Sequence, residues 1–184
     1  MKKIHHLIIN LFILGIASTA GAMGIQPGSL NISGIVGGYT FDSDERIKTR
    51  PVSGIRAGYN FNRNFGVEVL SNYVYTENKS TLENANVYRY GADFLMHFLP
   101  DTRLVPFVAA GVGFITVDWD NQRTDTSGAF NYGPGIKYFL NDNFALRGDL
   151  RHIILRNNDR TFNNVEYTVG ITYQFGGMNQ RSWR

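Results

Sequence analysis

Hydrophobic and polar residues alternate along most of this chain, and the clearest example lies between Phe130 and Ile153. Over residues 130–139, aromatic and aliphatic side chains occupy every second position, with asparagine, glycine and lysine between them. Over residues 143–155, Leu146 and Leu150 alternate with charged residues. A period of two predicts β-strands with one apolar and one polar face. The short connection between the two segments predicts an antiparallel hairpin.

The same alternation recurs in about eight segments. Their approximate bounds are 28–41, 52–61, 65–76, 86–98, 105–117, 128–139, 143–155 and 164–175. Long polar connections (42–51, 77–85, 118–127 and 156–163) alternate with short ones (62–64, 99–104 and 140–142). This order is typical of an up-and-down membrane barrel with its long loops outside and its short turns in the periplasm. We therefore predict an all-β fold, an eight-stranded antiparallel up-and-down transmembrane β-barrel.

The apolar faces are rich in aromatic residues toward the strand ends and carry no charge. A soluble barrel would bury these faces and leave many tyrosine hydroxyls without partners, whereas a membrane barrel turns them toward lipid. We assign two outward aromatic girdles, one of Phe61, Phe65, Phe98, Tyr138, Phe144, Tyr173 and Phe175, the other of Tyr73, Tyr75, Tyr88, Tyr90, Phe130 and Tyr132. The first strand is too rich in glycine for its faces to be assigned.

The opposite faces place ionisable side chains in the narrow interior. The predicted inward set is Arg56, Glu68, Arg89, Asp93, His97, Lys137, Arg147, Asp149, Arg151 and Glu166. A barrel of about eight strands encloses only enough space for side chains, so these groups are expected to pair and fill the lumen. The alternative is a narrow, gated ion path through the same groups.

Strand register follows from keeping inward residues opposite inward residues. We expect Phe61 to face Phe65 across Asn62-Arg63-Asn64, whose asparagines suit a tight turn. In the hairpin that starts at residue 130, we expect Phe139 to face Asn143 and Lys137 to face Ala145. A shift by two residues would set Lys137 against Arg147, and like charges opposite each other are unfavourable.

The start of the chain has the form of a secretory signal. Lys2 and Lys3 precede an apolar run, and Ala20-Gly21-Ala22 is a small-x-small cleavage site, so we expect residues 1–22 to be removed. The barrel then occupies residues 23–176 and a short tail residues 177–184. Without the two lysines, 16 basic side chains stand against 15 acidic ones, and the chain has no cysteine. These counts give no support for nucleic-acid binding, disulfides or thiolate metal sites.

Four stretches together resemble the outer membrane β-barrel domain of the OmpA-like proteins of Gram-negative bacteria. They are residues 106–113, 132–139, 143–152 and 167–175. The resemblance implies a location in the outer membrane and insertion by the barrel assembly machinery, which reads the last strand. That role falls on Tyr167, Val169, Ile171, Tyr173 and Phe175. We expect no peptidoglycan-binding domain after this strand, so a wall-tethering function is not carried over.

The expected function is a structural or surface-interaction role of a monomer among outer membrane lipids. The polar loops, with residues 44–46, Lys79, 123–125 and 157–160, either bind an extracellular ligand or simply shield the barrel mouth. Ion conduction is the first alternative, and a lipid-modifying enzyme using His97 or His152 is the second. No Ser/His/acid spacing supports catalysis, and no cofactor, metal site or phosphate-binding loop is indicated.

Overall fold

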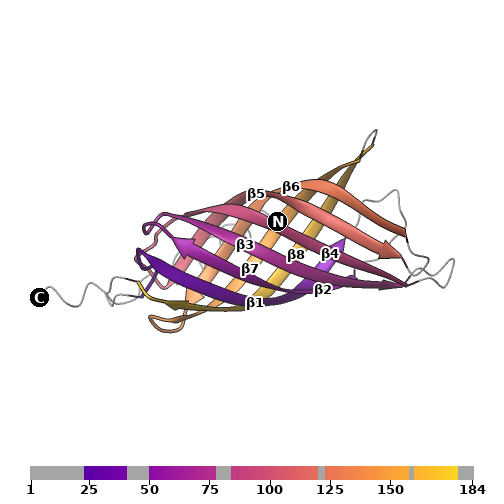
Figure 1. Cartoon of the computed structure of the whole chain (residues 1–184). Coiled ribbons are helices and arrows are strands. Elements are labelled where there is room, and N and C mark those ends of the chain that lie inside the picture. Colours follow the sequence, from indigo (N-terminus) through magenta and orange to yellow (C-terminus); the bar gives the residue numbers. More distant parts are fainter. Residues whose placement is uncertain (1–22, 41–49, 78–83, 120–122, 158–159, 178–184) are drawn as a thin grey trace, which may run out of the picture.

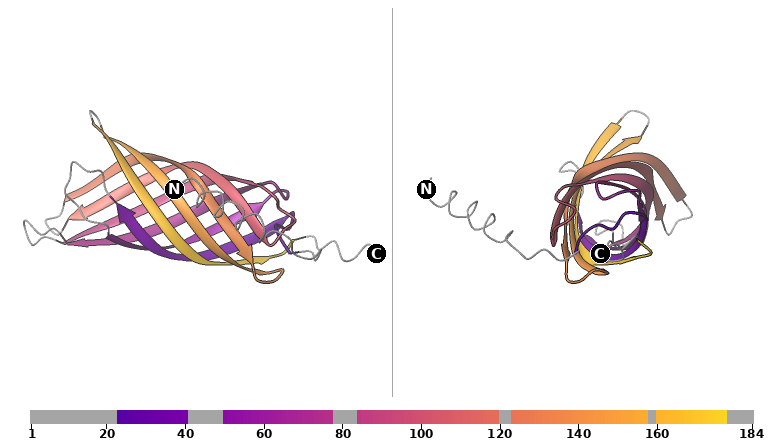
Figure 2. Two further views of the ribbon diagram at one scale, coloured as in Figure 1. Left: turned by 180° about the vertical axis from the view of Figure 1, so that it is seen from behind. Right: turned by 90° about the vertical axis from the view of Figure 1, so that its left-hand side faces the viewer.

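The chain folds into a closed barrel in which each strand pairs antiparallel with the next and β8 closes on β1 (Figures 1 and 2). This computed structural model describes residues 23–40, 50–77, 84–119, 123–157 and 160–177. The strands are β1 (Ser29–Thr40), β2 (Arg50–Asn60), β3 (Phe65–Glu77), β4 (Asn84–His97), β5 (Leu104–Trp119), β6 (Arg123–Phe139), β7 (Phe144–Asn157) and β8 (Arg160–Phe175). The predicted fold class is confirmed. The predicted signal peptide, loop residues 44–46 and Lys79 lie outside the described residues.

The connections between β2 and β3, β4 and β5, and β6 and β7 lie at one end of the barrel, together with the end of β8 (Figure 1, left). Short turns face the periplasm in barrels of this kind, so this is the periplasmic end. Among the described residues, no helix is long and apolar enough to cross a membrane.

Two of the expected long loops are mostly strand. Residues 118–127 and 156–163 were predicted to be loops, but β5 and β6 pair as far as Trp119 with Arg123, and β7 and β8 as far as Asn157 with Arg160. The prediction was wrong because it took polar residues as a sign of loop structure. On β5 the alternation of period two continues up to the first of these segments with its polarity reversed, since Thr116 and Asp118 face outward while Ile115 and Val117 face inward.

The outward faces are apolar across the membrane-spanning part of the wall. Among the described residues, none of the outward side chains between the two aromatic girdles is charged. Ile55, Val112 and Val169 are more than 60% exposed, as lipid-facing residues of an isolated barrel must be. The first strand, whose faces the sequence left open, turns Leu30, Ile32 and Val36 outward. Its inward side chains include those of Ser29, Asn31, Ser33, Ile35 and Tyr39, all buried.

The periplasmic hairpins confirm one predicted register and correct the other. Pairing of Asn60 with Gly66 leaves Asn62-Arg63-Asn64 in the turn, and Asn62 Oδ1 accepts hydrogen bonds from the backbone N–H groups of Asn64 and Phe65, both at 2.8 Å. In the second hairpin Phe139 pairs with Ala145, so the turn is Asn141-Asp142-Asn143 rather than residues 140–142.

Lys137 therefore does face Arg147, contrary to the prediction. The turn decides this register, because Asn141 Oδ1 accepts from the N–H groups of Asn143 at 2.9 Å and Phe144 at 2.8 Å, as Asn62 does in the first hairpin. The like-charge contact is tolerated because two carboxylates bind Arg147 directly. The repeated sequence Asn-x-Asn-Phe was the signal that could have identified this turn.

Candidate functional site

All ten ionisable side chains predicted to face inward lie buried in the lumen. They are Arg56 on β2, Glu68 on β3, Arg89, Asp93 and His97 on β4, Lys137 on β6, Arg147, Asp149 and Arg151 on β7, and Glu166 on β8. β1 and β5 add no charged side chain to the centre of this set. β5 instead contributes Phe107 and Ala109 to its buried face, together with two glycines.

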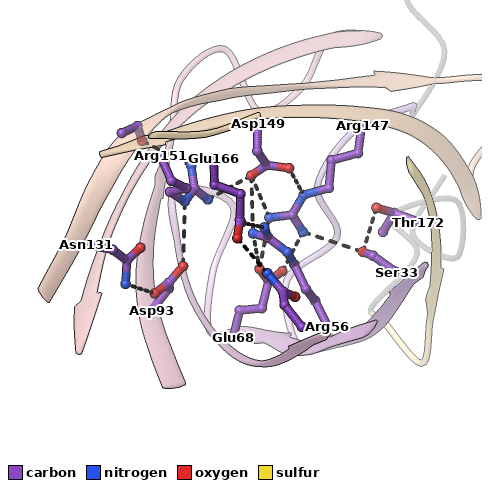
Figure 3. Close-up of polar contacts among 12 residues, drawn as sticks. Ser33, Arg56, Glu68, Asp93, Asn131, Arg147, Asp149, Arg151, Glu166 and Thr172 are labelled. Carbon is purple, nitrogen blue, oxygen red and sulfur yellow. Dashed lines mark hydrogen bonds and ion pairs between the residues drawn. The ribbon is translucent and has the colours of Figure 1, made fainter. Parts of the chain in front are cut away.

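Arg147 is the centre of the charged group (Figure 3). Its Nη1 and Nη2 atoms donate to the two carboxylate oxygens of Glu68 at 2.6 and 2.9 Å. Its Nε and Nη2 atoms donate to the two oxygens of Asp149 at 2.7 and 3.0 Å. Planar, two-pronged pairing of this kind is the strongest geometry that a guanidinium offers to carboxylates.

Arg56 joins this centre to Glu166 on the last strand. Its guanidinium lies 3.4 Å from an oxygen of each of Glu68, Asp149 and Glu166. Arg89 approaches Glu166 at 3.1 Å, and Asn72 Nδ2 donates to the same carboxylate at 3.0 Å. These contacts connect residues from five strands, so the pairs act as one network and not as separate salt bridges.

Arg151 extends the network toward β4. It donates to Asp149 at 2.7 Å, and its Nε atom lies 3.7 Å from Asp93, which also accepts from Asn131 at 3.0 Å. Four arginines thus stand against four carboxylates. Charges removed from water must be compensated in this way, because an uncompensated charge in the lumen costs several kcal/mol.

Lys137 lies beside this network and pairs with none of its acids. No carboxylate of the described residues lies within salt-bridge distance of Lys137, and its Nζ atom contacts His97 Nε2 at 3.3 Å. Nζ also lies 5.4 Å from the centre of the Phe107 ring, around which the guanidinium carbons of Arg147 and Arg151 lie at 5.2 and 5.7 Å.

Phe107 is the lumen residue that sequence reasoning missed. It pairs with Gly135, where an added Cβ would lie 2.2 Å from the phenyl ring, so the ring occupies the space that this glycine leaves. A cation against an aromatic face is stabilised by the ring quadrupole. The signal was present, since Phe107 shares the strand face of Ala109, Gly111 and Gly113.

Apolar side chains gather in the lumen on both sides of the charges. The extracellular apolar layer consists of buried Tyr39, Val52, Val74, Val87, Ile115, Ala129 and Ile153. The periplasmic apolar layer consists of buried Ile25, Val105, Phe139 and Ala145. β7 passes through all three levels, because its inward residues are Ala145, then Arg147, Asp149 and Arg151, then Ile153.

The two histidines of the enzyme hypothesis are far from forming one site. His97 lies inside the lumen beside Lys137. His152 is half-buried on the outer side, with its Nδ1 atom 3.0 Å from the Tyr132 hydroxyl. No hydrogen bond joins either ring to a serine within the described part of the chain. The same residues contain no cluster of three His, Asp or Glu side chains able to hold a metal.

The five residues of the expected assembly signal lie along the outer face of β8. Tyr167, Val169, Ile171 and Tyr173 are 43 to 62% exposed, and Phe175 is half-buried at the strand end. This face would therefore be available to the membrane and to an insertion machinery.

A closed eight-stranded antiparallel barrel with apolar outer faces, aromatic girdles and a charged lumen defines an integral protein of the bacterial outer membrane. The chain belongs to the outer membrane protein beta-barrel domain family, whose model matches residues 9–175. A search of curated proteins found no match.

Solved structures of small outer membrane proteins share the fold. The chain is similar to Neisserial surface protein A, with a TM-score of 0.69 and 15% identity over 80% of this chain and 99% of that one. It is similar to the N-terminal β-barrel domain of Pseudomonas aeruginosa OprF, with a TM-score of 0.58 and 20% identity over 82% and 100%. The attachment invasion locus protein of Yersinia pestis, in complex with a heparin analogue, gives a TM-score of 0.52 and 18% identity over 81% and 99%.

Proposed function

We propose that this protein is a closed-lumen scaffold that displays the extracellular ends of its strands at the cell surface. The arrangement along β7 carries the proposal. A charge network lies between the two apolar layers, with Ala145 and Ile153 both fully buried at its ends. Ions crossing the barrel would have to break paired charges and also pass both apolar layers, so a structural or surface-interaction role is favoured over conduction.

The surface that would be displayed is a collar of strand beyond the aromatic girdle. We use the name collar for residues 115–119, 123–129, 152–157 and 160–165. Two of its outward threonines are hydrogen-bonded to each other and to the girdle, with the Thr116 hydroxyl 2.8 Å from the Tyr90 hydroxyl and 3.1 Å from that of Thr126. An ordered polar surface of this kind suits contact with an extracellular ligand better than a flexible loop does.

Three kinds of partner follow from this role. Outer membrane lipids cover the apolar outer faces, and the barrel assembly machinery reads the outer face of β8 during insertion. The collar and the loops that it carries contact an extracellular ligand. The protein acts as a monomer and its own side chains carry out no catalysis.

Planar-bilayer recording tests the closed lumen. The purified barrel should be electrically silent, and Arg147→Ala should change this little while both apolar layers remain intact. A steady conductance that Arg147→Ala alters would overturn the proposal in favour of a narrow ion channel.

Thiol labelling of intact cells tests display. The chain has no cysteine, so single-cysteine variants report unambiguously. Thr126→Cys, on the exposed outer side of the collar, should react with a membrane-impermeant maleimide added outside the cells. The matched variant Val69→Cys, which is 59% exposed but faces lipid, should not react. Equal labelling of the two would contradict the proposed membrane position.

A further inference from the structure

Six residues that precede β1, Met23 to Gly28, run across the periplasmic mouth of the barrel. The Ile25 N–H donates to the Pro100 carbonyl oxygen at 2.9 Å, in the turn between β4 and β5. The Gly28 N–H donates to the Asn60 carbonyl oxygen at 2.8 Å, at the end of β2. The segment therefore spans the opening from one side of the barrel to another.

The main apolar contact of the segment is made by the side chain of Ile25, which we call the wedge. This side chain is 4% exposed and packs with Val105, Phe139 and Ala145, which are at most 1% exposed. These three residues come from β5, β6 and β7, and Met23 packs against the same group. Ile25 thus adds an apolar side chain from outside the wall to the periplasmic apolar layer.

The polar part ties the segment to the last strand. Gln26 Nε2 donates to the Asp142 carbonyl oxygen at 3.0 Å, in the turn between β6 and β7. Gln174 Nε2, at the end of β8, donates to the Gly24 carbonyl oxygen at 3.1 Å. Ser29 Oγ donates to the Gln26 carbonyl oxygen at 2.6 Å, so backbone polar groups of the segment are satisfied within the mouth.

Gly24 shows that this path requires a specific sequence. Its φ is 149°, and an added Cβ would lie only 2.1 Å from the Pro100 carbonyl oxygen. Any other residue would strain the backbone and push the segment away from the β4–β5 turn. The close approach of Gly24 to the β4–β5 turn therefore depends on a glycine at this position and does not result from loose packing of a terminus.

The barrel wall does not depend on the segment. All eight strand pairings, including the closure of β1 on β8, are made by residues 29–175. A segment that seals the mouth without belonging to the wall can move while the wall remains closed, since regions with few wall contacts open at a lower free energy than the core.

We propose that residues 23–28 form an intramolecular stopper that seals the lumen on the periplasmic side and can be displaced without opening the barrel wall. Displacement would admit water past Phe139 to Lys137, which lies two residues before Phe139 on β6. Lys137 is a buried cation that has no carboxylate partner among the described residues. This inference goes beyond the display role. It concerns hydration of the mouth and holds whether or not the collar binds a ligand.

Thiol access at Ala145 tests the stopper. Ala145→Cys places a reporter against Ile25, at a site that is 0% exposed. In the folded barrel in detergent micelles, a small water-soluble methanethiosulfonate should modify this thiol slowly. Adding Ile25→Asp should raise the rate at least about tenfold, because a buried, unpaired carboxylate is expelled to water and takes the segment with it.

Matched variants separate displacement of the stopper from general loosening. Ile25→Val keeps the wedge apolar and should leave the rate near that of the parent. A second reporter, Val52→Cys, lies in the extracellular apolar layer and should be unaffected by Ile25→Asp. Folding is checked by heat-modifiable gel mobility. If Ile25→Asp does not fold, Gly24→Ala displaces the segment without adding a charge.

Two results would overturn the inference. One is an Ala145→Cys rate that is the same with and without Ile25→Asp and Gly24→Ala, whether fast or slow, since the segment would then not be the barrier. The other is an equal acceleration at Val52→Cys, which would make the segment a support of the wall. Failure here would leave the bilayer and surface-labelling tests of the proposed function unaffected.

Discussion

The membrane span and the collar of this barrel follow the same alternation with opposite polarity. In the span, Val67 and Val69 of β3 face lipid while Glu68 faces the lumen. In the collar, Thr116 and Asp118 of β5 face outward while Ile115 and Val117 pack inside. In the membrane, the outer face of the sheet is apolar and its inner face is polar. In the collar, the same sheet has a polar outer face and an apolar inner face, as a soluble β-sheet protein does.

The solvent outside the wall accounts for the difference. Hydrocarbon favours apolar outer faces and leaves the lumen to polar groups, which must then satisfy one another. Water favours polar outer faces, so the interior of the collar can gain stability from apolar burial as in an ordinary soluble core. The change of polarity within β5 therefore locates the membrane boundary near Tyr90 and Thr116, which share a hydrogen bond of 2.8 Å.

The largest effect is expected from removing a lumen charge. Glu68→Gln leaves Arg147 with one carboxylate fewer and takes one from Arg56, and breaking a buried pair in this way costs about 3 to 5 kcal/mol. Urea titration of the barrel in lipid vesicles, scored by heat-modifiable gel mobility, measures the loss. Asp118→Asn on the exposed side of the collar is the control and should change the free energy of unfolding by less than about 1 kcal/mol.

A charge on the outer face should then distinguish the two regions directly. Val69→Arg places a cation in lipid near the middle of β3 and should destabilise the barrel by about 2 to 4 kcal/mol. Thr126→Arg places the same side chain on the outer face of the collar and should cost about 1 kcal/mol or less. Similar costs for both in the same titration would remove the distinction between span and collar.

A smaller loss is expected from trimming the interior of the collar. Ile153 is 0% exposed within the extracellular apolar layer, so Ile153→Val should cost about 0.5 to 1.5 kcal/mol. Half-buried Ile154, on the other face of β7, provides the control, and Ile154→Val should cost less. A larger loss of stability from Ile154→Val than from Ile153→Val would mean that the interior side chains of the collar do not form its hydrophobic core.

The smallest effect is expected at the periplasmic rim. Arg63 and Asp101 form a 2.7 Å ion pair between two turns, but both side chains are accessible to water. Asp101→Asn should therefore cost about 0.2 to 1 kcal/mol. The loss should shrink as salt screens the pair, which repeating the titration in added salt would detect. A loss that salt does not change would instead indicate a buried interaction.

The span was predictable from sequence to a large extent because its alternation is strict. Arg56, Glu68 and Arg147 could be placed inside from parity alone, and the two girdles from aromatic residues at the strand ends. The collar was not predictable by the same rule, because polar residues such as Thr124 and Asp125 are equally compatible with a loop. Only pairing across β5 and β6 distinguishes the two possibilities.

The charge network shows where local reasoning is insufficient. Considered as a pair, Lys137 opposite Arg147 is unfavourable, and that argument selected the wrong register. The deciding groups were Asn141, which shapes the turn, and Glu68 and Asp149, which neutralise Arg147. Glu68 lies 79 residues away from Arg147 in sequence, so a two-strand view could not include it.

The sequence alone determined that this chain forms a membrane barrel and which ionisable side chains face its lumen, because a period of two assigns alternate residues of a strand to opposite faces. The identity of each charge's partners, the two apolar layers and the crossing of the mouth by residues 23–28 depended on closure of the barrel. Closure brings all eight strands around one narrow space, where each residue meets side chains that neither its neighbours in sequence nor its own hairpin specify.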